Sequence, residues 1–176
     1  MQPDGVAEKP LAGRVALVSG GSRGIGRETV RLLASKGARV AFTFKSNKEA
    51  ADRVVQELKT AGAEARAYAF DVAESSEARK VCAELDGQWG GVQILVNNAG
   101  VTKDNLFIRM TEEEWDEVMR TNLRGAFTLT RAVAKGMMKK RWGRIINITS
   151  VSGLSGNVGQ ANYAASKMGL VGFTKS

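Results

Sequence analysis

Residues 14–26 read Arg-Val-Ala-Leu-Val-Ser-Gly-Gly-Ser-Arg-Gly-Ile-Gly, an apolar run that leads into a glycine-rich turn. The run Arg14–Ser19 has the length and composition of a strand buried on both faces of a parallel sheet, and a helical pattern follows Gly26. Glycines between a strand and a helix let the backbone approach a pyrophosphate, which then lies against the helix N–H groups. The stretch predicts a phosphate-binding loop, with a plain strand–helix turn as the alternative.

The alternation of strands and helices continues along the chain. Further strands are predicted at Ala38–Phe44, Ala65–Phe70, Gln93–Asn97 and Arg144–Thr149. Capping-box patterns at Ser46–Glu49 and Thr111–Glu114 predict the starts of two helices, the first of which ends near Gly62. This repetition predicts an α/β fold, a doubly wound parallel sheet of the Rossmann type with five strands present.

The two ends of the chain differ in character. Residues 1–10 are polar and predict a disordered tail, and residues 11–176 predict one domain. One loop and one helix, starting near Gln160, follow the fifth strand. A doubly wound sheet has a sixth strand beside the fifth, and without it the apolar edge Ile145–Ile148 is exposed. We therefore expect the domain to be incomplete at its C-terminus, with later strands missing; an edge covered by another subunit is the alternative.

Composition excludes several kinds of chemistry. The 176 residues include no histidine and one cysteine, Cys82, so Ser-His-Asp triads, histidine metal sites and disulfide frameworks are excluded, and we expect no metal. A single cysteine fits a reducing, cytoplasmic location. The net charge of +8 favours anionic partners. No nucleic-acid-binding motif accompanies this charge, so we do not expect a nucleic acid as a partner. No apolar run is long enough to cross a bilayer, so we do not expect a membrane either.

The end of the second predicted strand indicates which dinucleotide the loop would bind. Proteins that bind NAD place an acidic residue there to hold the ribose 2′-hydroxyl. Here Phe44 stands at that position and Lys45 follows it, while Arg23 is available from the glycine loop. Two cations without an anion favour a 2′-phosphate, so NADP is preferred over NAD. The alternative is that Lys45 is only a solvated residue at a helix entry.

The ends of the third and fourth strands also carry candidates. Asp71 could accept a hydrogen bond from an adenine amino group, or it could cap the next helix. Asn97 is expected to be structural, because amide side chains can tie neighbouring strand ends together. Asn98, Ala99 and Gly100 are expected to line the cofactor site.

Three residues near the C-terminus form a candidate catalytic set. Ser150 follows the fifth strand, Tyr163 lies 13 residues on, and Lys167 lies four residues beyond the tyrosine. On a helix, this last spacing puts the phenol and the ammonium on one face, where the cation favours the ionised phenol. Tyr163 is therefore a candidate general acid, and Ser150 would hydrogen-bond the substrate oxygen. Asn122 is a poor interior residue for a helix; it is either a buried amide that keeps a water in a proton path or an exposed residue.

Together these motifs resemble the short-chain dehydrogenase/reductase family. The resemblance rests on SGGSRGIG at residues 19–26, NNAG at 97–100, Asn122, Ser150 and Tyr163-x-x-x-Lys167. More narrowly, residues 100–110 (GVTKDNLFIRM) and 147–176 (NITSVSGLSGNVGQANYAASKMGLVGFTKS) are similar to the 3-oxoacyl-[acyl-carrier-protein] reductases of bacterial fatty-acid synthesis. Ser19 stands where the family usually has threonine.

The resemblance implies an NADPH-dependent reduction of a 3-oxoacyl thioester on an acyl carrier protein. It implies that Tyr163 protonates the substrate oxygen, Ser150 holds the carbonyl, Lys167 makes Tyr163 more acidic and binds the ribose, and Asn122 supports a water relay. The implied cofactor-binding residues are Ser19, Gly20, Ser22, Arg23, Gly24, Ile25, Gly26, Phe44, Lys45, Asp71, Val72, Asn98, Ala99, Gly100, Tyr163 and Lys167.

The resemblance also bears on partners and on activity. The basic run Lys139–Arg141 resembles the surface that receives the carrier protein; a solvated helix end is the alternative. Family members are usually tetramers packed through the helices that hold Asn122 and Tyr163, so a homo-oligomer is expected. The later strands and the substrate lid of the family are absent, so we expect little or no turnover. Another short-chain ketone reductase and a non-catalytic NADP-binding module are the alternatives.

Overall fold

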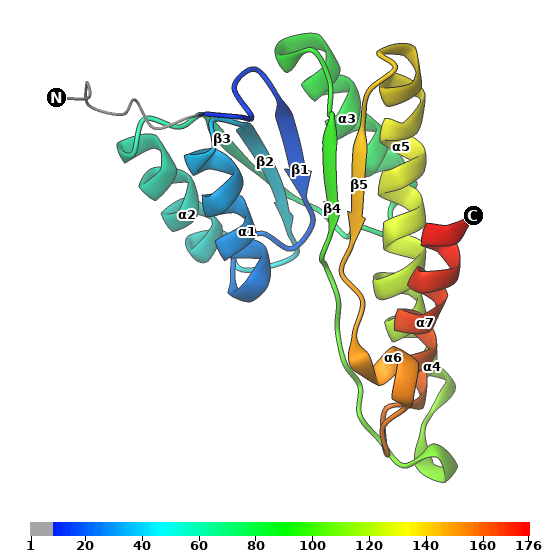
Figure 1. The fold of residues 1–176 in the computed structure, drawn as a ribbon. Helices are drawn as coiled ribbons and strands as arrows, with labels where there is room; N and C mark the ends of the chain where they lie inside the picture. Colours follow the sequence, from blue (N-terminus) through cyan, green and yellow to red (C-terminus); the bar gives the residue numbers. More distant parts are fainter. Residues whose placement is uncertain (1–8) are drawn as a thin grey trace, which may run out of the picture.

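The computed structural model describes residues 9–176, which form a five-stranded sheet with helices on both faces (Figure 1). The strands are β1 (Val15–Val18), β2 (Arg39–Phe44), β3 (Ala65–Ala69), β4 (Ile94–Asn97) and β5 (Arg144–Asn147). Their order is β3-β2-β1-β4-β5, and all neighbouring pairs are parallel. The predicted α/β fold with five strands is confirmed. Residues 1–8 of the predicted tail lie outside the described residues.

Helices connect the strands throughout. They are α1 (Gly24–Ser35), α2 (Lys48–Thr60), α3 (Ser75–Trp89), α4 (Glu112–Met119), α5 (Gly125–Lys139), α6 (Val151–Ser155) and α7 (Ala161–Lys175). A short 3₁₀ turn, Phe107–Arg109, precedes α4, and a π-helical segment, Arg120–Arg124, joins α4 to α5. The predicted capping box is present at the start of α4, where Thr111 and Glu114 bond each other's backbone N–H.

Two local predictions were wrong. Asn47, not Ser46, caps α2, because the Asn47 side chain reaches the N–H of Ala50 at 2.9 Å. A short helix, α6, interrupts the loop expected between the fifth strand and α7, and Ser150 caps it by accepting from the N–H of Ser152. Short serine-, asparagine- and glycine-rich stretches support either a turn or a helix start, so sequence patterns do not separate the two.

The core lies in two layers, one on each face of the sheet. On one face, Val15 and Leu17 of β1 pack with buried residues of α3 and α5. On the other face, Ala16 and Val18 pack with buried residues of α1 and α2. This alternation follows from the strand period of two, and every residue of β1 is completely buried. The central strand is therefore held rigidly at the point where its loop enters the site.

The sheet order also places the candidate site. The chain leaves β1 toward β2 on one side and returns through β4 on the other, so the carboxyl end of β1 is the topological switch point. Ligands of open α/β sheets bind at such a point, outside the carboxyl ends of the strands. At the outer edge of the sheet, Ile145 and Ile146 of β5 are 38% and 46% exposed, as expected for an edge strand. In the described part of the chain, no helix has both the length and the apolarity needed to cross a membrane.

Candidate active site

The glycine loop is fastened to the end of β4 by the side chains of Ser19 and Asn98. The Ser19 hydroxyl accepts hydrogen bonds from the N–H groups of Asn98 and Ala99, both at 2.9 Å. In return, the Asn98 amide donates to the carbonyls of Ser19 and Gly20 at 2.9 and 3.2 Å. Ser19 is buried and does not line the cavity that opens in front of the loop. Its hydroxyl therefore holds the loop in position.

Glycine is required in this loop for two separate reasons. Gly20 has a φ of +69°, in the left-handed region that side chains disfavour. Gly26, in the first turn of α1, packs so closely that a Cβ atom there would overlap the Gly20 carbonyl and lie 2.5 Å from Asn98 Nδ2. The first turn of α1 also has no capping side chain and no acidic residue. Its N–H groups are therefore open to an anion.

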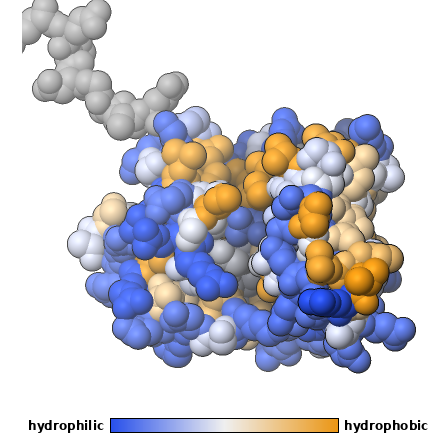
Figure 2. All heavy atoms as spheres, turned by 90° about the horizontal axis from the view of Figure 1, so that it is seen from below, coloured by the Kyte–Doolittle hydropathy of each residue, from blue (hydrophilic) through white to orange (hydrophobic). Residues whose placement is uncertain are grey.

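A cavity of about 520 Å³ opens in front of this loop, at the carboxyl edge of the sheet. Of the predicted cofactor-binding residues, those that border it are Gly20, Ser22, Arg23, Gly24, Ile25, Gly26, Phe44, Lys45, Asp71, Val72, Asn98, Ala99 and Gly100. Residues that were not predicted also line it: Thr43, Ser46, Asn47, Ala50, Phe70, Val101 and Thr121. Seen from this edge, the hollow has mainly hydrophilic residues on one side and apolar residues gathered on the other (Figure 2).

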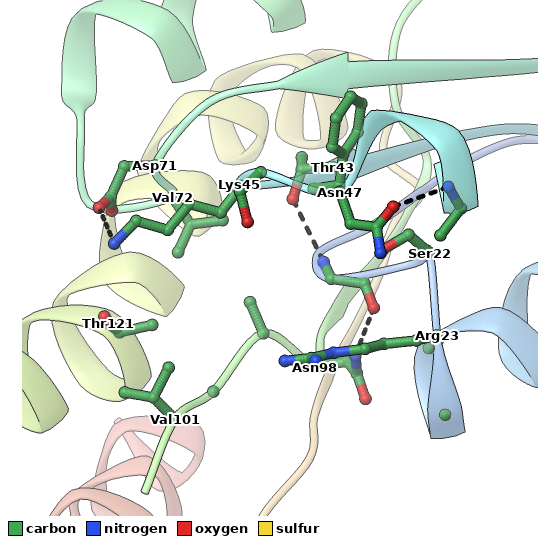
Figure 3. Close-up of a pocket in the computed structure, with 18 of the residues that line it drawn as sticks. Ser22, Arg23, Thr43, Lys45, Asn47, Asp71, Val72, Asn98, Val101 and Thr121 are labelled. Atoms are coloured by element: carbon green, nitrogen blue, oxygen red, sulfur yellow. Dashed lines mark hydrogen bonds and ion pairs between the residues drawn. The ribbon is translucent and has the colours of Figure 1, made fainter. Parts of the chain in front are cut away.

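Charged groups meet at the outer end of the cavity, where β2 and β3 end. Lys45 reaches across to Asp71, with 3.2 Å between Nζ and Oδ2, while Arg23 comes from the glycine loop on the other side (Figure 3). Arg120, which the sequence analysis did not single out, also contacts Asp71 Oδ2, at 2.5 Å. Burial raises the pKa of Asp71, but the hydrogen bond from the N–H of Ala73 and the pairing with Arg120 and Lys45 outweigh it. The pKa of Asp71 therefore lies below its ordinary value.

Two roles were considered for Asp71: accepting a hydrogen bond from an adenine amino group, and capping the next helix. The contacts of Asp71 test only the second. The N-cap of α3 is Glu74, so the alternative that Asp71 caps this helix was wrong. Asp71 Oδ1 instead accepts from the N–H of Ala73 at 3.0 Å and stabilises the turn before the helix. Asn97 is structural, as expected, because its amide donates to Asn147 of β5 at 2.8 Å and to Thr130 of α5 at 3.1 Å.

Asn122 is a buried amide, so the alternative of an exposed residue was wrong. It lies in the π-helical segment, 1% exposed. Its oxygen accepts from the N–H of Val101 at 2.8 Å, and its nitrogen donates to the Val101 carbonyl and to Ser166 at 3.1 and 3.0 Å. The amide thus pairs with a backbone segment that borders the cavity, and it joins that segment to α7.

Lys167 lies on the same face of α7 as Tyr163, as the spacing predicts. Its Nζ atom is 5.6 Å from the centre of the Tyr163 ring and donates to the carbonyl of Ile148 at 2.7 Å. Lys167 is 4% exposed, and burial lowers the pKa of its ammonium. A Cβ atom on Gly100 would lie 3.7 Å from Lys167 Nζ and 3.3 Å from Asn122 Oδ1. Because Gly100 also borders the cavity, the cavity and the candidate catalytic residues adjoin one another.

Ser150 and Tyr163 are both half-buried. Within residues 9–176, no hydrogen bond joins the side chains of Ser150, Tyr163 and Lys167, and none of the three borders the cavity directly. Asn162, which sequence reasoning missed, is completely buried and accepts from the N–H of Tyr163 at 2.7 Å, while its amide donates to the carbonyls of Lys103 and Glu114. The sequence did offer one indication of this role: Asn162 lies in the first turn of a helix, next to the candidate tyrosine.

The basic run Lys139–Arg141 lies elsewhere. It forms the exposed end of α5 and the turn that follows, at the amino edge of the sheet (Figure 1). The cavity is at the opposite, carboxyl edge. The run therefore does not border the cavity of its own chain.

The chain belongs to the short chain dehydrogenase family, whose model matches residues 14–176. It is similar to the proteins named 3-oxoacyl-[acyl-carrier-protein] reductase FabG of Vibrio cholerae (50% identical, 94% of this chain and 66% of the relative) and of Staphylococcus epidermidis (48%, 92% and 66%). A 3-oxoacyl-[acyl-carrier-protein] reductase of Synechocystis is 46% identical over 94% of this chain and 67% of its own length. The chain thus spans about two thirds of the length of these relatives, and the resemblance inferred from the motifs is confirmed.

The close approach at Gly26 gives a first prediction. Gly26→Ala places a methyl group against the Gly20 carbonyl and the Asn98 amide, so we expect it to lower the free energy of unfolding by about 2 kcal/mol or more. Gly136→Ala in α5 is the matched control, because no atom lies within 4 Å of its Cβ position, and it should raise that free energy by up to about 1 kcal/mol. Urea unfolding measures both; equal effects would contradict the packing described here.

The burial of Lys167 gives a second prediction. Its pKa in the folded chain lies below the ordinary value of 10.5, so between these two values the unfolded chain binds more protons. The contribution of Lys167 to the free energy of unfolding therefore rises with pH up to about 10.5. Urea unfolding from pH 7 to 10.5 should show wild type gaining stability relative to Lys167→Met. Lys135→Met, which removes an exposed charge of α5, is the control. A flat or falling difference for Lys167→Met would refute the prediction.

Proposed function

We propose that the chain binds NADPH and reduces, at a low rate, the 3-oxo group of an acyl thioester carried by acyl carrier protein. The observation that carries the proposal is the position of Gly100. This residue borders the cavity and also lies against Lys167 and Asn122, so the cavity adjoins the lysine that lies beside the candidate proton donor, Tyr163. The names of the relatives support the thioester and the carrier protein as substrate and partner.

The residues present fit a dinucleotide with a 2′-phosphate. The N–H groups of the glycine loop and of the first turn of α1 would hold the pyrophosphate, since that turn has no capping side chain and no acidic residue. Lys45 borders the cavity just after β2, where no carboxylate follows the strand, and Arg23 borders it from the glycine loop. Phe44 is buried beside them, in the position at which an acidic residue would favour NAD. These features support NADP over NAD.

A bound nicotinamide cofactor supplies hydride to the carbonyl carbon of the substrate. The Ser150 hydroxyl donates a hydrogen bond to the substrate oxygen and orients it. The phenol O–H of Tyr163 then breaks, and its proton goes to that oxygen, which completes the hydroxyl group of the product. Lys167 stabilises the phenolate that remains, because its ammonium lies on the same face of α7. Asn122 and Asn162 hold the neighbouring backbone in place.

Two further parts of the proposal concern location and assembly. A cytoplasmic location agrees with the single cysteine, Cys82, which is buried enough for its thiol pKa to be raised to about 11. A homo-tetramer packed through α7, which holds Tyr163, and through the π-helical segment of Asn122 with the adjoining α5 is proposed from the family resemblance. Exposed apolar side chains on these helices support it, among them Phe127 of α5 and Met168 of α7, each 48% exposed.

The test is the oxidation of NADPH by an acetoacetyl thioester, measured by absorbance with wild type and Tyr163→Phe. Loss of the phenolic proton should lower the rate by about 100-fold or more, while NADPH binding, measured by fluorescence, changes less than about twofold. The ratio between the two proteins is the readout, not the absolute rate. NADPH binding with the same turnover, or none, in both proteins would contradict the proposal and favour a non-catalytic binding module. Faster reduction of free ketones than of carrier-protein thioesters would favour another short-chain ketone reductase.

A further inference from the structure

A single carboxylate oxygen at the end of the cavity is shared by two cations. Asp71 Oδ2 lies 2.5 Å from Arg120 and 3.2 Å from Lys45. The three residues come from different segments: Lys45 follows β2, Asp71 follows β3, and Arg120 begins the π-helical segment. The other oxygen of Asp71 accepts from the N–H of Ala73, so the carboxylate is fixed in position.

The two cations differ in how they are placed. The Lys45 side chain is 62% exposed and borders the cavity, where Figure 3 shows it lying along the cavity wall toward Asp71. The Arg120 side chain is 38% exposed, does not border the cavity, and is also paired with Glu74 at 3.3 Å. Arg120 is therefore held by two carboxylates, those of Asp71 and Glu74, and does not line the cavity. Lys45 is the cation that can turn toward a ligand in the cavity.

A phosphate in the cavity competes with Asp71 for Lys45. The Asp71 side chain is only 17% exposed, so a carboxylate there that lost every cation would be poorly solvated. Arg120 would remove this penalty, because it would still pair with Asp71 Oδ2 if Lys45 turned to the phosphate. Without Arg120, Lys45 would be the remaining cation of Asp71, and the phosphate would have to break that pair.

We propose that Arg120 is a positioning residue for cofactor choice: it neutralises Asp71 and thereby frees Lys45 to bind the 2′-phosphate of NADP. The inference rests on the proposed NADP site. It assigns the preference for NADP over NAD to a residue that does not touch the cofactor. Arg120 acts through Asp71 and Lys45, so its effect falls on the phosphate and leaves the rest of the dinucleotide unchanged.

The test is the dissociation constant of NADP⁺ and of NAD⁺, measured by titration calorimetry on the 176-residue chain. In Arg120→Gln, the constant for NADP⁺ should rise about fivefold, at the upper end of the effect of a partly exposed ion pair. The constant for NAD⁺ should change less than about twofold, since NAD⁺ has no 2′-phosphate. Arg120→Lys keeps a cation near Asp71 and should restore most of the NADP⁺ affinity.

Two controls separate this effect from simple loss of charge or fold. Arg124→Gln removes an exposed cation four residues along the same segment and should leave the NADP⁺ to NAD⁺ ratio within about twofold of wild type. In a Lys45→Gln background, Arg120→Gln should no longer change the ratio, because no lysine remains for Asp71 to hold. Thermal unfolding without cofactor reports any structural role of Arg120 independently of the ratio.

The outcomes distinguish the role inferred for Arg120 from the NADP site on which that inference rests. A wild-type chain that binds NAD⁺ as tightly as NADP⁺ overturns both. A wild-type chain that prefers NADP⁺, with an unchanged ratio in Arg120→Gln, overturns the role of Arg120 and leaves the NADP site standing. An equal loss of affinity for both cofactors in Arg120→Gln, or an undiminished effect in the Lys45→Gln background, also overturns it.

Discussion

The reciprocal hydrogen bonding between Ser19 and Asn98 is the contact on which the candidate site depends. These residues are 79 positions apart, yet each bonds the backbone of the other strand end. The pairing joins the segments that follow the neighbouring strands β1 and β4 and sets the path of the glycine loop. A serine hydroxyl can accept both N–H groups as a threonine hydroxyl can, which accounts for the tolerance of serine at this position.

The part of the site that carries Tyr163 and Lys167 is held in place by two buried amides, Asn122 and Asn162. Asn122 pairs with Val101 and Ser166, and Asn162 pairs with the backbone around Tyr163. A buried amide costs free energy unless its hydrogen bonds are made, so these side chains act as fixed connectors. Asn122 lies in the π-helical segment between α4 and α5, and its side chain bonds the backbone of Val101 outside that helix. The candidate tyrosine and lysine are thereby held on an anchored helix, beside a rigid cavity wall.

The sequence predicted the parts of the structure that depend on local patterns. Strand positions followed from short apolar runs, and the start of α4 followed from the capping box at Thr111. Thirteen of the twenty residues that line the cavity followed from the glycine loop and from the ends of β2, β3 and β4. Thr43 and Thr121 were missed because they carry no motif. The Arg120–Asp71 pair was missed because its members are 49 residues apart, and charge pairs between separate loops have no spacing rule. The choice of Asn47 over Ser46 as a cap depended on the exact path of one turn.

The central claim is that the first turn of α1 and the end of β4 form one binding surface for the cofactor. Hydrogen–deuterium exchange of the chain with and without NADPH tests it most directly. The account predicts slower exchange of backbone amides at residues 20–26 and 98–101 when NADPH is present, with smaller changes in β3 and in α2 beyond its first turn. Unchanged exchange in the glycine loop, with protection confined to other segments such as residues 106–116, would contradict it.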